Sequence, residues 1–194
     1  MSTGPGDPAA STAAGEAHRG RRPAAILAIG VAIALALAAV GLRQNTAPPS
    51  GLEGKQAPVF SLPLLTAKPT RKPTVVQVPS SGKPTLLHFW GPSCAPCVAE
   101  SPAIAKLYAE GKASGAFDVI TVSAEDVPDI RAFMREKGHD YPVLYDADGR
   151  GHGHYHVNAI PVDFIIDGAG VVRHERRGAS SEDELRDLLK QVAK

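Results

Sequence analysis

Residues 85–97 read TLLHFWGPSCAPC, and this stretch decides the fold. Its first part, Thr85–Trp90, is almost continuously apolar, which is typical of a strand buried inside a parallel sheet. A Gly-Pro-Ser turn separates this strand from two cysteines. After them, apolar residues recur near helical spacing as far as Tyr108, and we expect Pro102 to kink that helix. The stretch therefore predicts a strand and a helix with the cysteine pair at their junction.

Shorter elements alternate around this unit. We expect a helix over Val127–Lys137, closed by Gly138, and a last helix that runs to Val192 from a capping box at Ser181 and Glu184. We also expect short strands, the last two forming a hairpin, at Val59–Leu62, Val75–Val78, Val119–Val122, Val143–Tyr145, Phe164–Ile166 and Val171–Glu175. This order predicts an α/β fold with helices flanking a mixed central sheet.

The chain before the folded domain divides into three segments. Residues 1–22 are rich in Ser, Thr, Gly, Pro and Ala, which predicts a disordered cytoplasmic tail. Residues 23–43 contain an uncharged run of about 20 residues, enough for a helix to cross ~30 Å of hydrocarbon. Residues 44–54 predict a flexible linker, so the folded domain is expected to span residues 55–194.

Two interpretations of residues 23–43 compete. Ala36-Leu37-Ala38 resembles a signal-peptide cleavage site, but the apolar run exceeds the usual signal core of roughly 7–15 residues, which favours an uncleaved anchor. Arg19, Arg21 and Arg22 precede the run. By the positive-inside rule they place the tail in the cytoplasm and the domain on the extracytoplasmic, periplasmic side of the membrane.

Charge and cysteine content exclude several classes of protein. The net charge is +1, with 21 Lys and Arg against 20 Asp and Glu, so no global field attracts nucleic acid. The only two cysteines lie three positions apart, so a disulfide between them cannot crosslink distant parts of a fold. A structural zinc site needs about four ligands, and no second cysteine pair is present. The pair therefore indicates redox chemistry without a metal.

The spacing of Cys94 and Cys97 suits dithiol chemistry. Such an enzyme needs one exposed, ionised thiol and a second thiol that resolves the mixed disulfide. At the start of a helix, free N–H groups and the helix dipole favour the Cys94 thiolate. Cys97 then lies one turn further in and attacks Cys94 to release the partner. Pro96 falls in the first turn, where its missing N–H costs little.

From about Gly54 to Lys194, the chain resembles the thioredoxin superfamily. It is similar in particular to the membrane-anchored reductases of the TlpA/ResA/DsbE type, which implies a thioredoxin-like fold preceded by one transmembrane helix. The resemblance rests on these features, in this order: Ala57–Phe60 (APVF), Phe89-Trp90 before Cys94 and Cys97, Glu100 and Pro102, and Ile160-Pro161 ahead of Phe164–Asp167 (FIID).

The resemblance also implies roles for individual residues. Pro161 is implied to be cis and to pack against the disulfide, Ile160 to offer backbone hydrogen bonds to an extended substrate, and Trp90 to border that substrate. Glu100 is implied to relay a proton to or from Cys97. The alternatives are an ordinary trans turn proline at 161 and a solvated helix glutamate at 100.

The chain departs from the pattern of this family at three positions. Ser93 stands where a Trp is usual, and Val162 replaces a common Thr, which puts partner recognition and redox potential in doubt. His88 occupies the strand position where thioredoxin has a buried acid. We hypothesise that His88 tunes Cys97 by hydrogen bonding; a core histidine satisfied by a backbone carbonyl is the alternative.

His152, His154 and His156 form a second cluster. Their spacing suits a metal on an extended segment, or through the first and last of them on a helix. No carboxylate pattern or cysteine joins them, which favours a solvated loop or helix edge.

The resemblance implies a thiol–disulfide oxidoreductase without a cofactor. It would reduce selected protein partners such as apocytochrome c and be recycled by a membrane redox partner. A thiol oxidase that acts in the folding of secreted proteins has the same motif, but its electrons flow in the opposite direction. A thioredoxin-fold peroxidase needs an upstream Thr and Pro at set spacing, which Pro92-Ser93-Cys94 does not provide. A metal-delivery module usually spaces its cysteines one residue wider.

Overall fold

The computed structural model describes residues 29, 48–65, 74–79 and 82–193. The chain divides into two compact units at Asn45 and Thr46, and the second unit carries the features described below.

The predicted tail (residues 1–22) and membrane segment (residues 23–43) lie outside the described residues, apart from Ile29. Among the helices described, none combines the length and the apolar character needed to cross a membrane.

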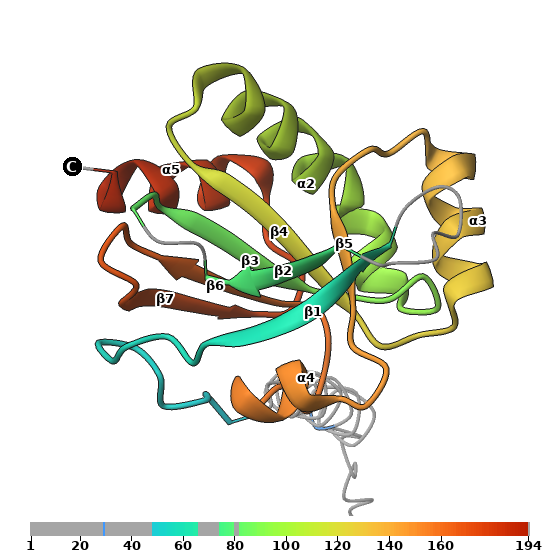
Figure 1. The fold of residues 1–194 in the computed structure, drawn as a ribbon, viewed down its shortest axis with the longest axis horizontal. Helices are drawn as coiled ribbons and strands as arrows, with labels where there is room; N and C mark the ends of the chain where they lie inside the picture. Colours follow the sequence, from blue (N-terminus) through green and yellow to red (C-terminus); the bar gives the residue numbers. More distant parts are fainter. Residues whose placement is uncertain (1–28, 30–47, 66–73, 80–81, 194) are drawn as a thin grey trace, which may run out of the picture. The chain divides into compact units, whose positions relative to one another are not determined.

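Seven strands of the described chain form one mixed sheet in the order β2-β1-β5-β4-β3-β6-β7 (Figure 1). They are β1 (Phe60–Leu65), β2 (Val75–Val78), β3 (Thr85–Phe89), β4 (Asp118–Ser123), β5 (Val143–Tyr145), β6 (Val162–Ile166) and β7 (Val172–Arg177). β3 pairs in parallel with β4 and antiparallel with β6. All five residues of β3 are buried, as its apolar run predicted.

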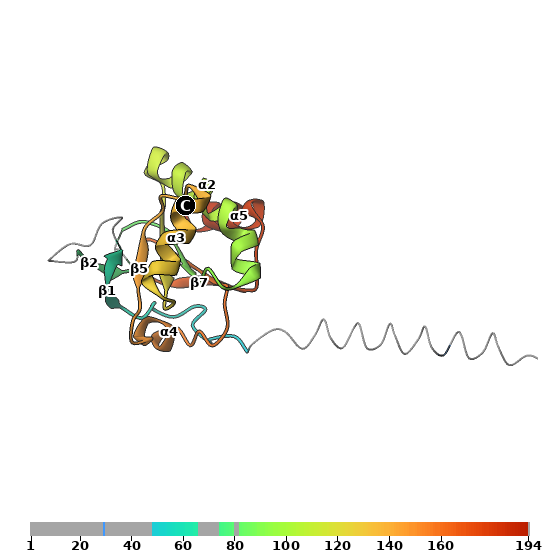
Figure 2. The same ribbon diagram turned by 90° about the vertical axis from the view of Figure 1, so that its right-hand side faces the viewer.

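The helices cover the two faces of the sheet unequally. They are α2 (Ala95–Ser114), α3 (Val127–Lys137), α4 (Arg150–His154) and α5 (Glu182–Val192). α2, α3 and α5 bury residues such as Ile104, Ile130 and Leu189 in one cluster on one face. The other face packs around Phe89 and Tyr155, and the short α4 lies against it. In Figures 1 and 2, α4 lies away from α2 and α5. The predicted α/β fold with a mixed sheet is confirmed.

α2 is longer than the sequence pattern predicted. We expected it to end at Tyr108, and it continues to Ser114. Gly111 explains the extension, because a Cβ at this position would lie 2.6 Å from the Phe117 carbonyl oxygen, so only glycine lets the helix pack this closely. The helix stops where Gly115 adopts a left-handed conformation with φ of 66°.

The described part of the predicted linker, residues 48–54, lies against β7. The backbone N–H of Ser50 donates to the Glu175 carboxylate at 3.0 Å, and the N–H of Gly54 donates to the Val172 carbonyl at 2.8 Å. β7 is an edge strand, and edge strands have free backbone groups that a neighbouring segment can bind. A Gly- and Pro-rich composition does not reveal such pairing.

Candidate active site

Cys94 and Cys97 form a disulfide at the start of α2, with 5.2 Å between their Cα atoms. Cys94 is the N-cap residue, and its Sγ accepts the backbone N–H of Cys97 at 3.3 Å. Cys97 is fully buried, whereas Cys94 is partly exposed. The site therefore has one accessible sulfur at a helix N-terminus and one hidden sulfur behind it.

The loop before β6 forms the opposite wall of the site. The Ile160–Pro161 peptide bond is cis, as the resemblance implied, and Pro161 is buried. The Ile160 carbonyl oxygen lies 3.6 Å from Cys94 Sγ. An extended partner that reaches Cys94 therefore meets the Ile160 backbone as well, and its binding there stays a prediction.

Glu125 holds the turn that precedes Cys94. The N–H and the hydroxyl of Ser93 donate to the two oxygens of its carboxylate, at 3.0 and 2.7 Å. Gly91 makes room for this contact, because a Cβ at residue 91 would lie 1.9 Å from Glu125 Oε1. Ser93, the main departure from the family pattern, thus has a structural partner that the sequence did not reveal.

Trp90 lies beneath the site. It is 1% exposed, its indole N–H donates to Thr121 Oγ1 at 3.1 Å, and its ring packs against Phe133 and Tyr141. The residue therefore supports the turn from inside the core. Its predicted contact with substrate has no counterpart in this geometry and stays a prediction.

Glu100 lies one turn after Cys97 on α2, and it is 3% exposed. Its Oε1 accepts the backbone N–H of Ser180 at 2.9 Å, and a carboxyl oxygen of Glu100 lies within 4.8 Å of one of Asp163. Oε2 has no hydrogen-bond partner among the described residues. Burial, followed by the negative charge of Asp163, raises the pKa of Glu100 to about 8. Glu100 is thus a buried acid with high proton affinity, not a solvated helix residue.

Asp163 is the acid that we did not single out from the sequence. It faces His88 across the β3–β6 pair, and its Oδ1 lies 2.8 Å from His88 Nδ1. Both side chains are fully buried, which raises the pKa of Asp163 to about 7 and lowers the pKa of His88 to about 4. His88 is therefore neutral at pH 7, and the contact is a hydrogen bond to a neutral imidazole. One signal was available: Asp163 is the single polar residue in the run VDFII.

The contacts of His88 change our hypothesis about its role. Its hydrogen bond goes to Asp163, so any influence on Cys97 passes through Asp163 and Glu100. Ligand atoms of His88, Glu100 and Asp163 lie within 4.8 Å of one another. In the part of the chain that the structure describes, these three side chains are the one group close enough to hold a metal ion.

The histidines of the second cluster point to different partners. His152 Nδ1 lies 2.7 Å from Asp146 Oδ2, the ring of His154 stacks against Phe60, and His156 Nδ1 lies 2.9 Å from the Ser50 carbonyl oxygen. They occupy α4 and its end, in agreement with the interpretation as a helix edge. The structure does not bring them together as a metal site.

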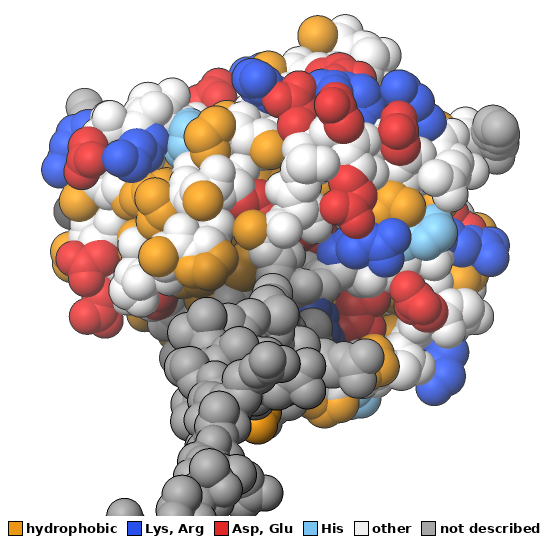
Figure 3. Space-filling model, turned by 180° about the vertical axis from the view of Figure 1, so that it is seen from behind, with side chains coloured by type: hydrophobic (Ala, Val, Ile, Leu, Met, Phe, Trp, Pro, Cys, Tyr) orange, Lys and Arg blue, Asp and Glu red, His pale blue; other side chains and the backbone are white. Residues whose placement is uncertain are grey.

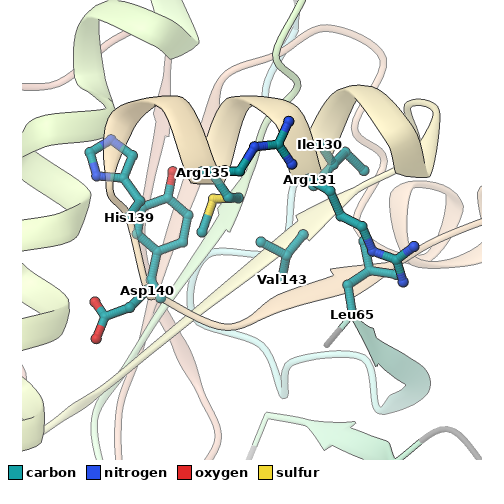
Figure 4. Close-up of a pocket in the computed structure, with 9 residues that line it drawn as sticks. Leu65, Ile130, Arg131, Arg135, His139, Asp140 and Val143 are labelled. Carbon is teal, nitrogen blue, oxygen red and sulfur yellow. The ribbon is translucent and has the colours of Figure 1, made fainter. Parts of the chain in front are cut away.

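A separate cavity of about 460 Å³ lies between α3 and the edges of β1 and β5 (Figure 4). Its apolar side is formed by Leu65, Ile130 and Val143, and the Arg131 and Arg135 side chains extend from α3 beside it. Neither cysteine lines it. The cavity is therefore distinct from the dithiol.

Charges are mixed on the face of the molecule shown in Figure 3. Acidic and basic side chains alternate along its upper edge rather than separating into patches. Ion pairs such as Lys106–Glu182 and Arg186–Glu110 join α2 to α5. This face therefore has no field of one sign that would attract a charged partner.

The fold and the site together define a class of protein. A mixed sheet, a Cys-x-x-Cys disulfide at a helix N-terminus and a facing cis-proline form a thioredoxin-like redox site. The protein is a thiol–disulfide oxidoreductase.

Comparison with known proteins agrees with this class. Residues 54–175 match the model of the AhpC/TSA family, and the chain belongs to this family. It is 32% identical to the thiol:disulfide interchange protein DsbE of Xylella fastidiosa, over 83% of this chain and 81% of that protein. It is 30% identical to the thiol-disulfide oxidoreductase ResA of Bacillus anthracis, over 72% of this chain and 78% of that protein.

A solved structure gives the same result. The fold is similar to that of a putative thiol:disulfide interchange protein DsbE from Chlorobium tepidum, with a TM-score of 0.64 and 26% identity. The match covers 73% of this chain and 98% of that one. The predicted resemblance to DsbE- and ResA-type proteins is thereby confirmed.

Proposed function

We propose that the protein reduces disulfides in selected partner proteins, such as apocytochrome c, on the extracytoplasmic side of the membrane. The observation that carries the proposal is the asymmetric dithiol, with Cys94 accessible beside the Ile160 carbonyl and Cys97 buried one turn before Glu100. Similarity to proteins named DsbE and ResA supports it.

The reaction proceeds by two exchanges at sulfur. The Cys94 thiolate attacks the partner disulfide and forms a mixed disulfide, and one partner sulfur leaves as a thiolate. Cys97 then attacks Cys94 Sγ, which releases the second partner sulfur and forms the Cys94–Cys97 disulfide. Two electrons pass from the dithiol to the partner, and a membrane redox partner restores the dithiol.

In its ionised form, Glu100 takes the proton that Cys97 must lose before it attacks. The two side chains lie on one face of α2, and Glu100 is buried, so its proton exchanges with Cys97 more readily than with bulk water. In the reverse direction, when the disulfide is reduced, Glu100 returns the proton to Cys97.

Residues 23–43 anchor the domain to the membrane, with residues 1–22 on the cytoplasmic side. The length of the uncharged run and the arginines before it support this topology. Carbonate extraction of membranes and N-terminal sequencing of the mature chain test it. A soluble chain that begins after Ala38 would show a cleaved signal peptide instead.

Trapping of partners tests the function directly. In a Cys97→Ala chain the mixed disulfide on Cys94 cannot be resolved, so partners accumulate and can be identified by mass spectrometry. A Cys94→Ala, Cys97→Ala chain is the control. We expect a few proteins of cytochrome maturation. A broad set of newly secreted proteins would favour oxidative folding, and no trapped partner would contradict disulfide exchange.

The reduction potential separates reductase from oxidase. We expect a potential nearer that of thioredoxin, about −270 mV, than that of the oxidant DsbA, about −120 mV. Equilibration of the Cys94–Cys97 pair in glutathione or dithiothreitol buffers measures it. A value near the DsbA end would identify a thiol oxidase.

A further inference from the structure

Three buried acid–base groups lie together on the sheet face that α2 and α5 cover. Glu100 is 3% exposed, His88 1% and Asp163 0%. Ser180, in the loop before α5, joins the two acids, because its N–H donates to Glu100 Oε1 at 2.9 Å and its hydroxyl donates to Asp163 Oδ2 at 3.4 Å. Ser180 is half-buried, so it also links the group to solvent.

Two buried carboxyls with oxygens within 4.8 Å of each other do not ionise independently. The repulsion between two negative charges and the cost of burying both leave one proton shared between them. His88 is neutral and its Nδ1 binds one oxygen of Asp163, which leaves the other side of that carboxyl for Glu100 and Ser180. Between the pKa values of the two acids, at about pH 7 to 8, the pair therefore carries one negative charge and one proton.

The charged group that acts on Asp163 from α5 already has a partner. From α5, the charge of Glu184 acts on Asp163 in the same direction as burial, and Arg176 on β7 binds Glu184 at 2.8 Å. From α2, Cys97 is the group that gains or loses a proton during the reaction.

We propose that Glu100 and Asp163 form a two-site proton store for Cys97, in which Asp163 and His88 act as positioning residues. The inference rests on the proposed function and assigns the proton acceptor to a pair of acids rather than to Glu100 alone.

The proton of Cys97 and the electrons of the disulfide move in separate steps. The Cys97 thiol gives its proton to the singly ionised pair, which becomes neutral. The Cys97 sulfur attacks Cys94 Sγ, the bond between Cys94 and the partner breaks, and the electron pair leaves on the partner sulfur, which takes a proton from water. When a dithiol later reduces the Cys94–Cys97 bond, the pair returns its proton to the Cys97 thiolate.

The pH profile of the Cys97 step tests the proposal. Ellman's reagent forms a mixed disulfide with Cys94 of the reduced full-length protein, and release of the second chromophore reports the attack of Cys97. For Asp163→Asn, we expect the midpoint of the rate against pH to fall by about one unit, because Glu100 loses its acidic neighbour. The plateau rate should fall about threefold, because the remaining acceptor is a weaker base.

Matched variants separate the possible causes. Asp146→Asn alters a second buried histidine–aspartate pair on the other sheet face, and it should keep the wild-type profile. Glu100→Gln should slow the Cys97 step about tenfold or more at pH 7. A wild-type profile for Asp163→Asn with a slow Glu100→Gln would overturn the proton store and leave the proposed role of Glu100. Wild-type rates in both variants would overturn both.

Two measurements on the wild-type chain complete the test. Carboxyl ¹³C NMR should show Glu100 and Asp163 titrating in coupled steps, and independent single transitions would contradict the proposal. Oxidised protein should bind no stoichiometric Zn²⁺ in calorimetry. Zinc binding that Asp163→Asn abolishes would make the group a metal site and overturn the proton store.

Discussion

Among the described residues, two histidine–aspartate pairs each have a fully buried aspartate and differ in their surroundings. His88–Asp163 lies on the sheet face that α2 and α5 cover, with 2.8 Å between Nδ1 and Oδ1. His152–Asp146 lies by α4 on the other face, with 2.7 Å between Nδ1 and Oδ2. Both aspartates are fully buried. Distance and burial alone therefore do not distinguish a structural pair from a reactive one.

The two aspartates differ in whether backbone N–H groups bind them. Asp146 also accepts the N–H groups of Gly151 and His152 at 3.0 and 2.9 Å, so fixed donors surround a charge that holds the start of α4. Asp163 meets another acid and a hydroxyl instead of backbone N–H groups. The first environment satisfies the carboxyl group with backbone donors, and burial in the second one raises the pKa of Asp163.

Removal of Asp146 should have the largest effect on stability. Asp146→Ala leaves two backbone N–H groups and His152 without their acceptor, and we expect the free energy of unfolding to fall by about 3 kcal/mol or more. Denaturant unfolding measures it. The rate of disulfide exchange per folded molecule should stay unchanged, and a loss of exchange would show that the two pairs are not separate in function.

Asp163→Asn should show the opposite behaviour. The amide retains an oxygen that accepts from His88 and presents its NH₂ group to the Ser180 hydroxyl oxygen. It also removes a group whose ionised form is poorly accommodated, so we expect the free energy of unfolding at pH 7.5 to change by less than about 1 kcal/mol. The same denaturant titration measures it. A loss as large as that of Asp146→Ala would mean that Asp163 is a structural carboxylate.

The pH dependence of stability should reveal the protons that Glu100 and Asp163 bind more tightly in the folded state. The folded-state pKa values of Glu100 and Asp163, about 8 and about 7, lie above their unfolded values, so their contribution is complete at acid pH and is lost as pH rises. His88, with its pKa lowered to about 4, acts oppositely, but only below its unfolded value of 6.5. Between about pH 6.5 and 8, stability should therefore fall, by up to about 1.4 kcal/mol per pH unit for each proton.

Thermal unfolding over this pH range measures the slope. Glu100→Gln and Asp163→Asn should each flatten it, because each removes one of the two acids. Equal slopes in the three proteins would show that neither acid binds its proton more tightly in the folded state.

His152→Asn should have the smallest effect. Asp146 keeps its two backbone donors, and the His152 side chain is 18% exposed, so we expect a loss of about 1 kcal/mol or less in unfolding free energy. Comparison with Asp146→Ala in the same assay shows how much of that pair depends on the backbone. Equal losses would assign the stabilisation to the imidazole instead.

The reaction centre could be predicted from the sequence because its residues are adjacent or belong to a recognisable pattern. Cys94 and Cys97 lie in one helical turn, and Pro161 precedes an apolar strand at the position that the resemblance marks. α3 and β5 have the predicted bounds for a similar reason, since local apolar spacing and Gly138 define them.

The residues that escaped prediction owe their roles to tertiary contacts. Asp163 becomes reactive only because the antiparallel register of β3 and β6 places it opposite His88 and beneath α2. Glu125 follows β4 and lies 32 positions from Ser93, yet it holds the turn at the site. No local pattern encodes either contact, and the same is true of Ser50 against β7.

The contact between Glu125 and Ser93 has an evolutionary consequence. A side chain at Gly91 would collide with the Glu125 carboxylate, and an aromatic residue at position 93 would keep the backbone N–H but lose the hydroxyl that binds it. A tryptophan at position 93 would therefore favour a second change at Glu125. Positions 91, 93 and 125 should co-vary among descendants of this sequence. We expect a substitution at one of these positions alone to be disfavoured.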